Sequence, residues 1–269
     1  MRNQERKNTM NDLFRLDGKV ALVTGASQGI GFAMACGLAN AGATLCFNSH
    51  CQESVDRGMK AYHEAGVDAH GYVCDVTDEA AVKNLVATIE KEVGTIDILV
   101  NNAGMIKRIP ALEMTVQEFK DVVDLDLTAP FVCAQAVLPG MIKKGGGKII
   151  NICSMMSELG RETVVAYASA KGGLKMLTKN LASEFGEYNI QVNGIGPGYI
   201  ATPQTAPLRE NGHPFNTFII GKTPAARWGT TDDLVGPVVF LASKASDFVN
   251  GHILYVDGGI LAYIGKQPK

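Results

Sequence analysis

Tyr167 and Lys171 lie four residues apart, and Ser154 lies thirteen residues before the tyrosine. Residues at positions i and i+4 share one face of a helix, so the ammonium of Lys171 can approach the phenol of Tyr167. A nearby positive charge favours the phenolate over the phenol. Tyr167 could therefore act as a general acid or base, and the Ser154 hydroxyl could hold a substrate oxygen. Taken alone, such a pair is more often found on a helix surface.

The composition is that of a globular α/β protein. The 269 residues are 46% hydrophobic and 19% charged, and they include 30 glycines. The net charge of −2 gives no bulk electrostatic attraction to nucleic acid or to an anionic membrane, so neither partner is expected. No apolar run appears long enough in the sequence to span a membrane, and the N-terminus lacks a secretory apolar segment. We expect a cytoplasmic protein.

The six cysteines show no spacing typical of a metal site. They stand at positions 36, 46, 51, 74, 133 and 153, with no Cys-x-x-Cys and no Cys/His cluster. Several fall in apolar runs. Free thiols in a reducing cytoplasm are therefore expected rather than disulfides, and no metal is expected.

Short apolar runs alternate with helical patterns along the whole chain. The runs cover residues 19–24, 43–48, 69–74, 96–100, 148–153, 190–195 and 252–256, and the helical patterns fall near 29–41, 52–65, 78–92, 115–143, 166–187 and 231–243. Apolar strands separated by helices predict a parallel sheet that is covered on both faces. We expect one domain over residues 13–269, after a loose polar extension at 1–12. Residues 199–230 contain four prolines, lack strand periodicity and are expected to form a substrate lid.

The first apolar run leads into a glycine-rich turn, Gly25-Ala26-Ser27-Gln28-Gly29-Ile30-Gly31. Glycines between a strand and a helix allow a tight turn and bring the helix N-terminus close to a pyrophosphate. The spacing G-x-x-x-G-x-G differs from the G-x-G-x-x-G of longer dehydrogenases. Its place after the first strand of an alternating pattern favours a dinucleotide site over a simple turn.

Further motifs follow in a fixed order. They are Asn101-Asn102-Ala103-Gly104 after the fourth run, Ser154, Tyr167 with Lys171, and Pro197-Gly198 after the sixth run. With the glycine turn, this set resembles the short-chain dehydrogenase/reductase family over about residues 13–262. The resemblance implies a Rossmann-like three-layer α/β sandwich with a seven-stranded parallel sheet. It also implies hydride transfer to or from a nicotinamide cofactor and a homotetramer.

The resemblance also implies a role for each motif. Tyr167 would be the acid/base, Ser154 would orient the substrate carbonyl, and Lys171 would favour the phenolate and hold the nicotinamide ribose. The expected cofactor-binding residues are Gly25, Ser27, Gln28, Gly29, Ile30, Gly31, Ser49, His50, Asp75, Val76, Asn102, Ala103, Gly104, Tyr167, Lys171, Pro197, Gly198, Ile200 and Thr202.

Asp126 occupies the position of the family's fourth catalytic residue, which is usually an asparagine. In the family this residue works largely through its main-chain carbonyl, which binds a water that leads to the lysine. Pro130 has no N–H to donate to the carbonyl of residue 126, so that carbonyl is left free whichever side chain residue 126 carries. We therefore expect a retained water relay. The alternative is a solvated helix acid with an incidental proline kink.

The residues at the end of the second strand indicate the choice between NAD and NADP, because an acid there would bind the ribose 2′-hydroxyl of NAD. The residues there are Asn48, Ser49 and His50, and none is a carboxylate. Because an acid would repel the 2′-phosphate of NADP, its absence favours NADP(H), with NAD(H) possible. Neither Gln28 in the glycine turn nor Ser49 and His50 supplies the full positive charge of an arginine.

Basic residues follow two of the strands that lead to the site. Lys107 and Arg108 come after the Asn-Asn-Ala-Gly turn, and Arg161 lies between Ser154 and Tyr167. Cations at the carboxyl edge of a sheet suggest an anionic substrate, and the arginine fork matches a carboxylate. Residues 152–161, 222–229 and 248–252 resemble the branch of the family that interconverts gluconate and 5-ketogluconate. The expected substrate-binding residues are Lys107, Arg108, Ser154, Glu158, Arg161, Tyr167 and Gln204.

Other functions stay open at this point. One is reduction of another keto acid, such as a deoxygluconate, or of an acyl thioester. Another is a nucleotide-binding regulator that keeps the fold without the chemistry. The polar segment 199–230 and Arg161 argue against a long acyl chain, and the intact Ser154, Tyr167 and Lys171 set argues against a regulator.

Overall fold

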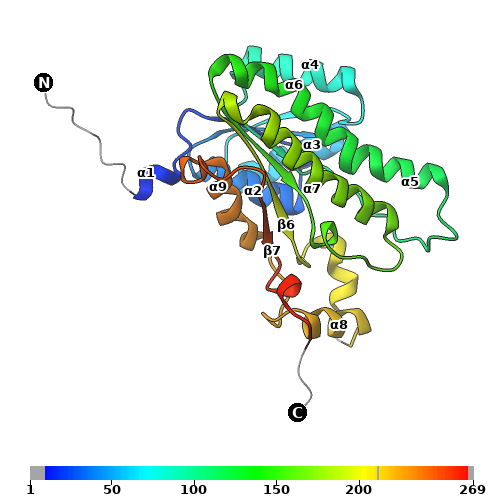
Figure 1. Ribbon diagram of the computed structural model, residues 1–269. Coiled ribbons are helices and arrows are strands. Elements are labelled where there is room, and N and C mark those ends of the chain that lie inside the picture. The colour runs from blue at the N-terminus through cyan, green and yellow to red at the C-terminus, as the bar shows by residue number, and fades with distance from the viewer. Residues whose placement is uncertain (1–9, 211, 266–269) are drawn as a thin grey trace, which may run out of the picture.

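A seven-stranded parallel sheet forms the centre of the protein in the computed structural model, which describes residues 10–210 and 212–265 (Figure 1). The strand order is β3-β2-β1-β4-β5-β6-β7. The strands are β1 (Val20–Val23), β2 (Thr44–Ser49), β3 (Ala69–Val73), β4 (Ile98–Asn101), β5 (Gly147–Ile152), β6 (Ile190–Pro197) and β7 (Ile253–Val256). The parallel sheet expected from the alternating pattern is confirmed.

Helices cover both faces of this sheet, as expected. Side chains of α2, α3 and α9 pack in one core, and those of α4, α6 and α7 pack in the other. The helices are α1 (Met10–Phe14), α2 (Gly29–Asn40), α3 (Gln52–Glu64), α4 (Glu79–Glu92), α5 (Val116–Val123), α6 (Ala129–Lys144), α7 (Val165–Phe185), α8 (Pro214–Lys222) and α9 (Val235–Ala242). Strands β1, β4 and β5 are buried almost throughout, which explains their largely apolar sequences.

The strand order reverses direction between β1 and β4. The chain runs outward from β1 to β2 and β3, and then returns to pair β4 against the other side of β1. In open α/β sheets, ligands bind at such a switch point, beyond the carboxyl ends of the strands. The glycine turn after β1 and the Asn102 turn after β4 both lie there.

The single helix expected over residues 115–143 is divided into α5 and α6 by a π-helical turn, Asp124–Thr128. Within this turn the N–H of Ala129 donates to the carbonyl of Asp124, five residues back. Pro130 follows directly and has no N–H to continue the α-helical pattern. A π turn rotates the side chains it contains relative to the flanking helix, and it often marks a functional site.

The continuous helical stretch from Val116 to Lys144 is long and apolar enough to cross a membrane by length and composition alone. The expectation that no run reaches that length is therefore wrong. In the fold, α6 packs its apolar residues against the sheet, with Val137 and Met141 buried in the core. The α6 part of this stretch is accordingly a core helix of the sandwich, while α5 buries only Val122.

Three other expectations change in detail. The lid segment 199–230 contains a 3-10 turn, Pro203–Arg209, and helix α8. The pattern at 231–243 begins as a 3-10 turn, Thr231–Leu234, before α9. Most of the extension at 1–12 lies outside the described residues, and its last part belongs to α1. All six cysteines are free, and four of them are buried.

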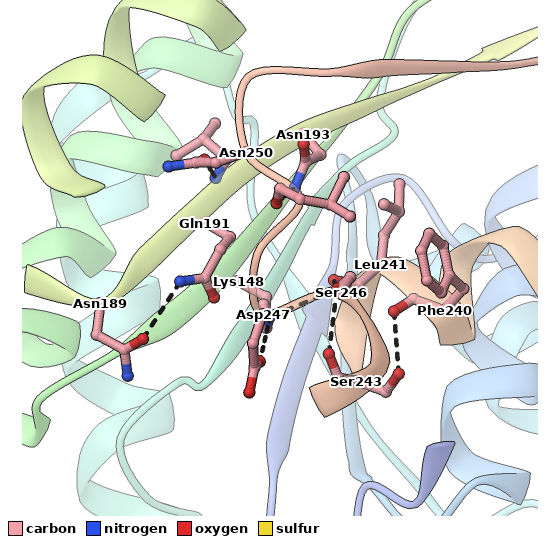
Figure 2. Close-up of polar contacts among 12 residues, drawn as sticks. Lys148, Asn189, Gln191, Asn193, Phe240, Leu241, Ser243, Ser246, Asp247 and Asn250 are labelled. Carbon is pink, nitrogen blue, oxygen red and sulfur yellow. Dashed lines mark hydrogen bonds and ion pairs between the residues drawn. The ribbon is translucent and has the colours of Figure 1, made fainter. Parts of the chain in front are cut away.

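Two asparagines attach the segment before β7 to the edge of β6 (Figure 2). The buried Asn193 side chain donates to the carbonyl of Val249 (2.7 Å) and accepts from the N–H of His252 (3.0 Å). Asn250 in turn accepts from the N–H of Val192 at 2.8 Å. These side chains satisfy backbone groups where the ladder between the strands has not yet begun, and so they position β7 in the sheet.

We expect Asn193→Ala to lower the free energy of unfolding by about 1–3 kcal/mol, because the Val249 carbonyl and the His252 N–H lose their partner. The control is Asn180→Ala, which removes an exposed asparagine that donates to the carbonyl of Met176 on α7. It should change stability by less than about 0.5 kcal/mol. Urea denaturation of both variants measures the difference, and equal losses would contradict this role for Asn193.

Candidate active site

The glycine turn between β1 and α2 requires glycine at three positions. Gly25 and Gly29 have φ angles of +62° and +65°, which favour glycine. A Cβ on Gly25 would lie 2.9 Å from the Cα of Ala103, and one on Gly31 would lie 2.3 Å from Nδ2 of Asn102. The turn is therefore packed directly against the turn that follows β4. At Gly29, by contrast, a Cβ would meet no atom within 4 Å, so the backbone there faces open space.

Asn102 joins the two turns at the switch point. Its Nδ2 donates to the carbonyls of Thr24 (2.8 Å) and Gly25 (3.0 Å). The Thr24 hydroxyl accepts in turn from the backbone N–H groups of Asn102 and Ala103. These bonds hold the ends of β1 and β4 in one rigid unit beside a large cavity.

The cavity has a volume of about 1160 Å³. This exceeds the ~300–1,000 Å³ usual for a pocket that holds a single small ligand. All of the expected cofactor-binding residues line it, from Gly25 in the glycine turn to Thr202 at the start of the lid. The tight glycine cradle and the volume both fit a dinucleotide with a second small molecule.

Lys171 is buried and lies close to Tyr167. Its ammonium stands 5.6 Å from the centroid of the Tyr167 ring and donates to the carbonyl of Ile152 at 2.8 Å. Helix α7 presents both side chains to the cavity, as the i, i+4 spacing predicts. Ser154 follows β5, and its Oγ accepts from the N–H of Met156 at 3.1 Å. The Ser154 hydroxyl hydrogen therefore remains able to donate into the cavity.

Asp126 is fully buried, so the alternative of a solvated helix acid is wrong. One carboxylate oxygen accepts from the N–H of Met105 (2.7 Å), and the other lies 3.2 Å from Nζ of Lys171. The π turn gives the side chain this direction, which the sequence pattern did not indicate. The expected water relay through the carbonyl of residue 126 remains a prediction.

Burial and the ion pair shift the pKa of Lys171 in opposite directions, and the same is true of the pKa of Asp126. Burial lowers the pKa of Lys171, but the negative charge of Asp126, with smaller contributions from Tyr167 and Cys153, outweighs it and raises the pKa above its ordinary value. Burial raises the pKa of Asp126, and Lys171 and the Met105 N–H counter part of that increase. Asp126 therefore favours the positively charged form of the buried Lys171.

The substrate residues expected from the sequence divide into two groups. Arg108, Arg161 and Gln204 line the cavity together with Ser154 and Tyr167. Nη1 of Arg161 donates to the Tyr199 hydroxyl at 3.0 Å, and its guanidinium lies 5.4 Å from the centroid of the Phe215 ring. Arg161 thus connects the loop before α7 to the lid.

Lys107 and Glu158 are not among the residues that line the cavity, so the structure does not bring them together with the other expected substrate residues. Lys107 forms an ion pair with Asp121 on α5 at 2.8 Å. Glu158 accepts from Lys175 at 2.7 Å and from the Tyr255 hydroxyl at 2.7 Å. Both charged side chains therefore contact other elements of the fold. These contacts depend on how distant segments pack, which the spacing of residues in the sequence does not indicate.

Two further expectations concern residues near the mouth of the cavity. Met155 and Met156 pack with Tyr167 and Tyr199 in a small apolar cluster, in agreement with a packing role. The Asp75 carboxylate accepts from the backbone N–H (2.9 Å) and the hydroxyl (2.7 Å) of Thr77, and these bonds lower its pKa. Asp75 therefore shapes its own loop while lining the cavity.

Arg57 also lines the cavity, although it was not expected from the sequence pattern. It lies in the second turn of α3, eight residues beyond the end of β2. No motif includes it, and only the packing of α3 beside β2 brings it to the site.

Comparison with known proteins identifies relatives along nearly the whole chain. The family model described as "Enoyl-(Acyl carrier protein) reductase" matches residues 25–261. A 2-dehydro-3-deoxy-D-gluconate 5-dehydrogenase of Formosa agariphila is 60% identical over 96% of this chain and 98% of its own length. A 5-keto-D-gluconate 5-reductase of Escherichia coli is 48% identical over 95% of this chain and 100% of its own.

A solved structure with ligands extends the comparison. It is a gluconate 5-dehydrogenase from Burkholderia cenocepacia in complex with NADP and tartrate. Its sequence is 42% identical to this chain, its TM-score is 0.90, and the match covers 95% of this chain and 100% of that one.

We expect Asp126→Asn to bind NADPH normally at pH 7 but to lose that binding at a lower pH than the unaltered protein. Without the carboxylate, less negative charge counters the effect of burial, and the pKa of Lys171 falls. The ammonium that is expected to hold the ribose therefore loses its proton at a lower pH. NADPH fluorescence titrations between pH 7 and 10.5 measure this. The control is Asp124→Asn, an exposed aspartate of the same π turn. Identical pH profiles for both variants would show that Asp126 does not support the charge of Lys171.

Proposed function

The chain belongs to the short-chain dehydrogenase/reductase family, and we propose that it transfers hydride reversibly between NADP(H) and C5 of a sugar acid, interconverting D-gluconate and 5-dehydro-D-gluconate. The observation that carries this proposal is a single cavity lined by Ser154, Tyr167 and Lys171, by the glycine turn, and by Arg161. It unites a proton-transfer group, a dinucleotide cradle and a cation that can bind a carboxylate.

The dinucleotide would lie along the carboxyl edge of the sheet. The glycine turn, Asn102 to Gly104 and Pro197 to Thr202 would contact it, and Lys171 would hold its nicotinamide ribose. When bound, NADPH supplies the hydride. Tight backbone approach at Gly25 and Gly31 and the open space beyond Gly29 support this placement.

Ser154, Tyr167 and Lys171 would bind the substrate carbonyl and transfer the proton. The Ser154 hydroxyl, whose oxygen already accepts from Met156, would donate to the substrate oxygen. Tyr167 would give its proton to that oxygen during reduction and remove it during oxidation. Lys171, charged through its pairing with Asp126, would stabilise the tyrosine anion that results.

Arg161 would bind the carboxylate of the sugar acid. Its guanidinium lines the cavity, and its hydrogen bond to Tyr199 and its contact with Phe215 fix its position at the lid. Because Arg161 pairs with a neutral hydroxyl and an aromatic ring in these contacts, its charge can still attract an anion. Arg108 and Gln204 line the same cavity and would bind other oxygens of the substrate.

A second substrate is favoured by several of the relatives and solved structures, among them a 2-keto-3-deoxy-D-gluconate dehydrogenase structure whose sequence is 68% identical to this chain. The relative that is 60% identical is a 2-dehydro-3-deoxy-D-gluconate 5-dehydrogenase. That compound also carries a carboxylate at C1 and reacts at C5, and it differs from gluconate at C2 and C3. Initial rates with D-gluconate and with 2-dehydro-3-deoxy-D-gluconate, each with NADP⁺ and with NAD⁺, decide between them. A higher kcat/KM for the deoxy acid would reassign the physiological substrate while keeping the C5 chemistry.

The same family membership supports proposals about assembly and location. We propose a cytoplasmic homotetramer of single-domain subunits, in which α5, α6 and α7 pack against other subunits. Val116, Phe131, Val165 and Met176 of these helices are exposed apolar side chains, and the six free cysteines suit a reducing compartment. A monomeric mass by light scattering at micromolar concentration would contradict the tetramer.

We expect Tyr167→Phe to lower kcat by about 10²–10⁴, the usual contribution of a general acid or base. The affinity for NADPH should change little, because the ring still packs and Lys171 still holds the ribose. Stopped-flow turnover and NADPH titration measure the two effects. A loss of kcat below about tenfold would point to another proton donor.

We expect Arg161→Ala to raise KM for gluconate by about tenfold or more while kcat falls much less, because a remote carboxylate contact is felt equally in the ground and transition states. The control is Arg15→Ala, which removes an exposed arginine that pairs with Asp17. Steady-state kinetics of both variants test this. An unchanged KM in Arg161→Ala would exclude Arg161 from the substrate site.

A further inference from the structure

The cavity extends to the ends of β2 and β3, well away from Tyr167. Asn48, Ser49, His50 and Thr77 line this part, together with Ser54 and Arg57 of α3. In the sheet, β1 and β4 separate β2 from β5, after which Ser154 stands. At about 4.8 Å per strand, the two ends lie roughly 14 Å apart. This part of the cavity is therefore suited to the adenosine half of a dinucleotide.

Most polar groups in this region already have structural partners. Asn48 donates to the carbonyl of Cys74 at 2.8 Å, and its Oδ1 accepts from the N–H of Gly25 at 3.4 Å. The Asp75 carboxylate accepts from Thr77. The Asn48 amide and the Asp75 carboxylate are therefore engaged in contacts within the protein.

Arg57 is the arginine of this region, and its charge is not matched by a carboxylate. Its Nη2 donates to Oγ of the buried Ser54 at 3.0 Å, one helical turn earlier on the same face of α3. Within residues 10–210 and 212–265, no carboxylate oxygen lies within 4.0 Å of its guanidinium nitrogens. Of the other lysines and arginines that line the cavity, Lys171 pairs with Asp126 and Arg161 contacts Tyr199, while Arg108 follows β4 rather than β2 or β3 and is proposed to bind the substrate.

We propose that Arg57 binds the 2′-phosphate of NADP(H), with Ser49 and Ser54 as neighbouring hydroxyl donors, and that it sets the preference of the enzyme for NADP(H) over NAD(H). The planar guanidinium can donate two parallel hydrogen bonds to a phosphate, and the absence of an acid at residues 48–50 removes the repulsion that a phosphate would meet. The inference rests on the proposed use of NADP(H). It supplies the positive charge that the glycine turn and the end of β2 lack.

The test is direct binding of NADPH and of NADH, followed by nucleotide fluorescence, to the unaltered protein and to Arg57→Ala. We expect the dissociation constant for NADPH to rise about 10- to 100-fold, the loss of a charge-assisted contact, and that for NADH to change less than about twofold. Arg57→Lys should give an intermediate loss, because a point charge replaces the fork. The control is Lys60→Ala on the same helix, an exposed cation that pairs with Glu64 and does not line the cavity.

Competition with nucleotide fragments separates the contribution of the 2′-phosphate to binding from that of the nicotinamide. Adenosine 2′,5′-bisphosphate should displace NADPH from the unaltered protein more effectively than 5′-AMP, and Arg57→Ala should remove that advantage. If the unaltered protein prefers NADPH and Arg57→Ala keeps the preference, the assignment of Arg57 is wrong and the cofactor assignment stands. Equal weakening of NADPH and NADH would also overturn it. If the unaltered protein shows no preference for NADPH, both the cofactor assignment and the role of Arg57 fail.

Discussion

The ammonium of Lys171 is buried, and the arrangement of the site depends on how that charge is accommodated. An unpaired charge in a protein interior is strongly unfavourable, so a buried lysine either finds partners or loses its proton. Here the end of β5 provides the Ile152 carbonyl and the π turn provides the Asp126 carboxylate. The end of β5, the π turn and α7 must therefore meet within hydrogen-bond distance of one ammonium group. The same convergence places Ser154 and Tyr167 in the cavity.

Asp126 explains why the long helix is divided. A regular helix through residues 116–144 would leave the side chain of residue 126 in a different direction, whereas the π turn directs it to Lys171 and to the N–H of Met105. A carboxylate in place of the family's usual asparagine gives the lysine a full counter-charge. The cost of burying two charges is reduced because the Met105 N–H donates to one carboxylate oxygen, the other oxygen lies 3.2 Å from the ammonium, and the ammonium donates to the Ile152 carbonyl.

Features that follow from local periodicity could be predicted from the sequence. The parallel sheet, the i, i+4 relation of Tyr167 and Lys171, and the tight turn at glycines 25 and 29 are of this kind. Features that depend on how distant segments meet could not. The carboxylate of Glu158 accepts from Lys175 and Tyr255, whose positions beside it depend on the fold. Arg57 lines the cavity but belongs to no sequence motif. Helix α8 was missed because four prolines interrupt the pattern around it.

We propose that NADPH bound in this cavity delivers its hydride to C5 of a sugar acid. The most direct measurement is reduction of 5-dehydro-D-gluconate with NADPH that carries deuterium at the transferable C4 position, followed by NMR of the product. We predict one deuterium, bound to C5 of D-gluconate. Deuterium at another carbon, or a product without deuterium, would contradict it.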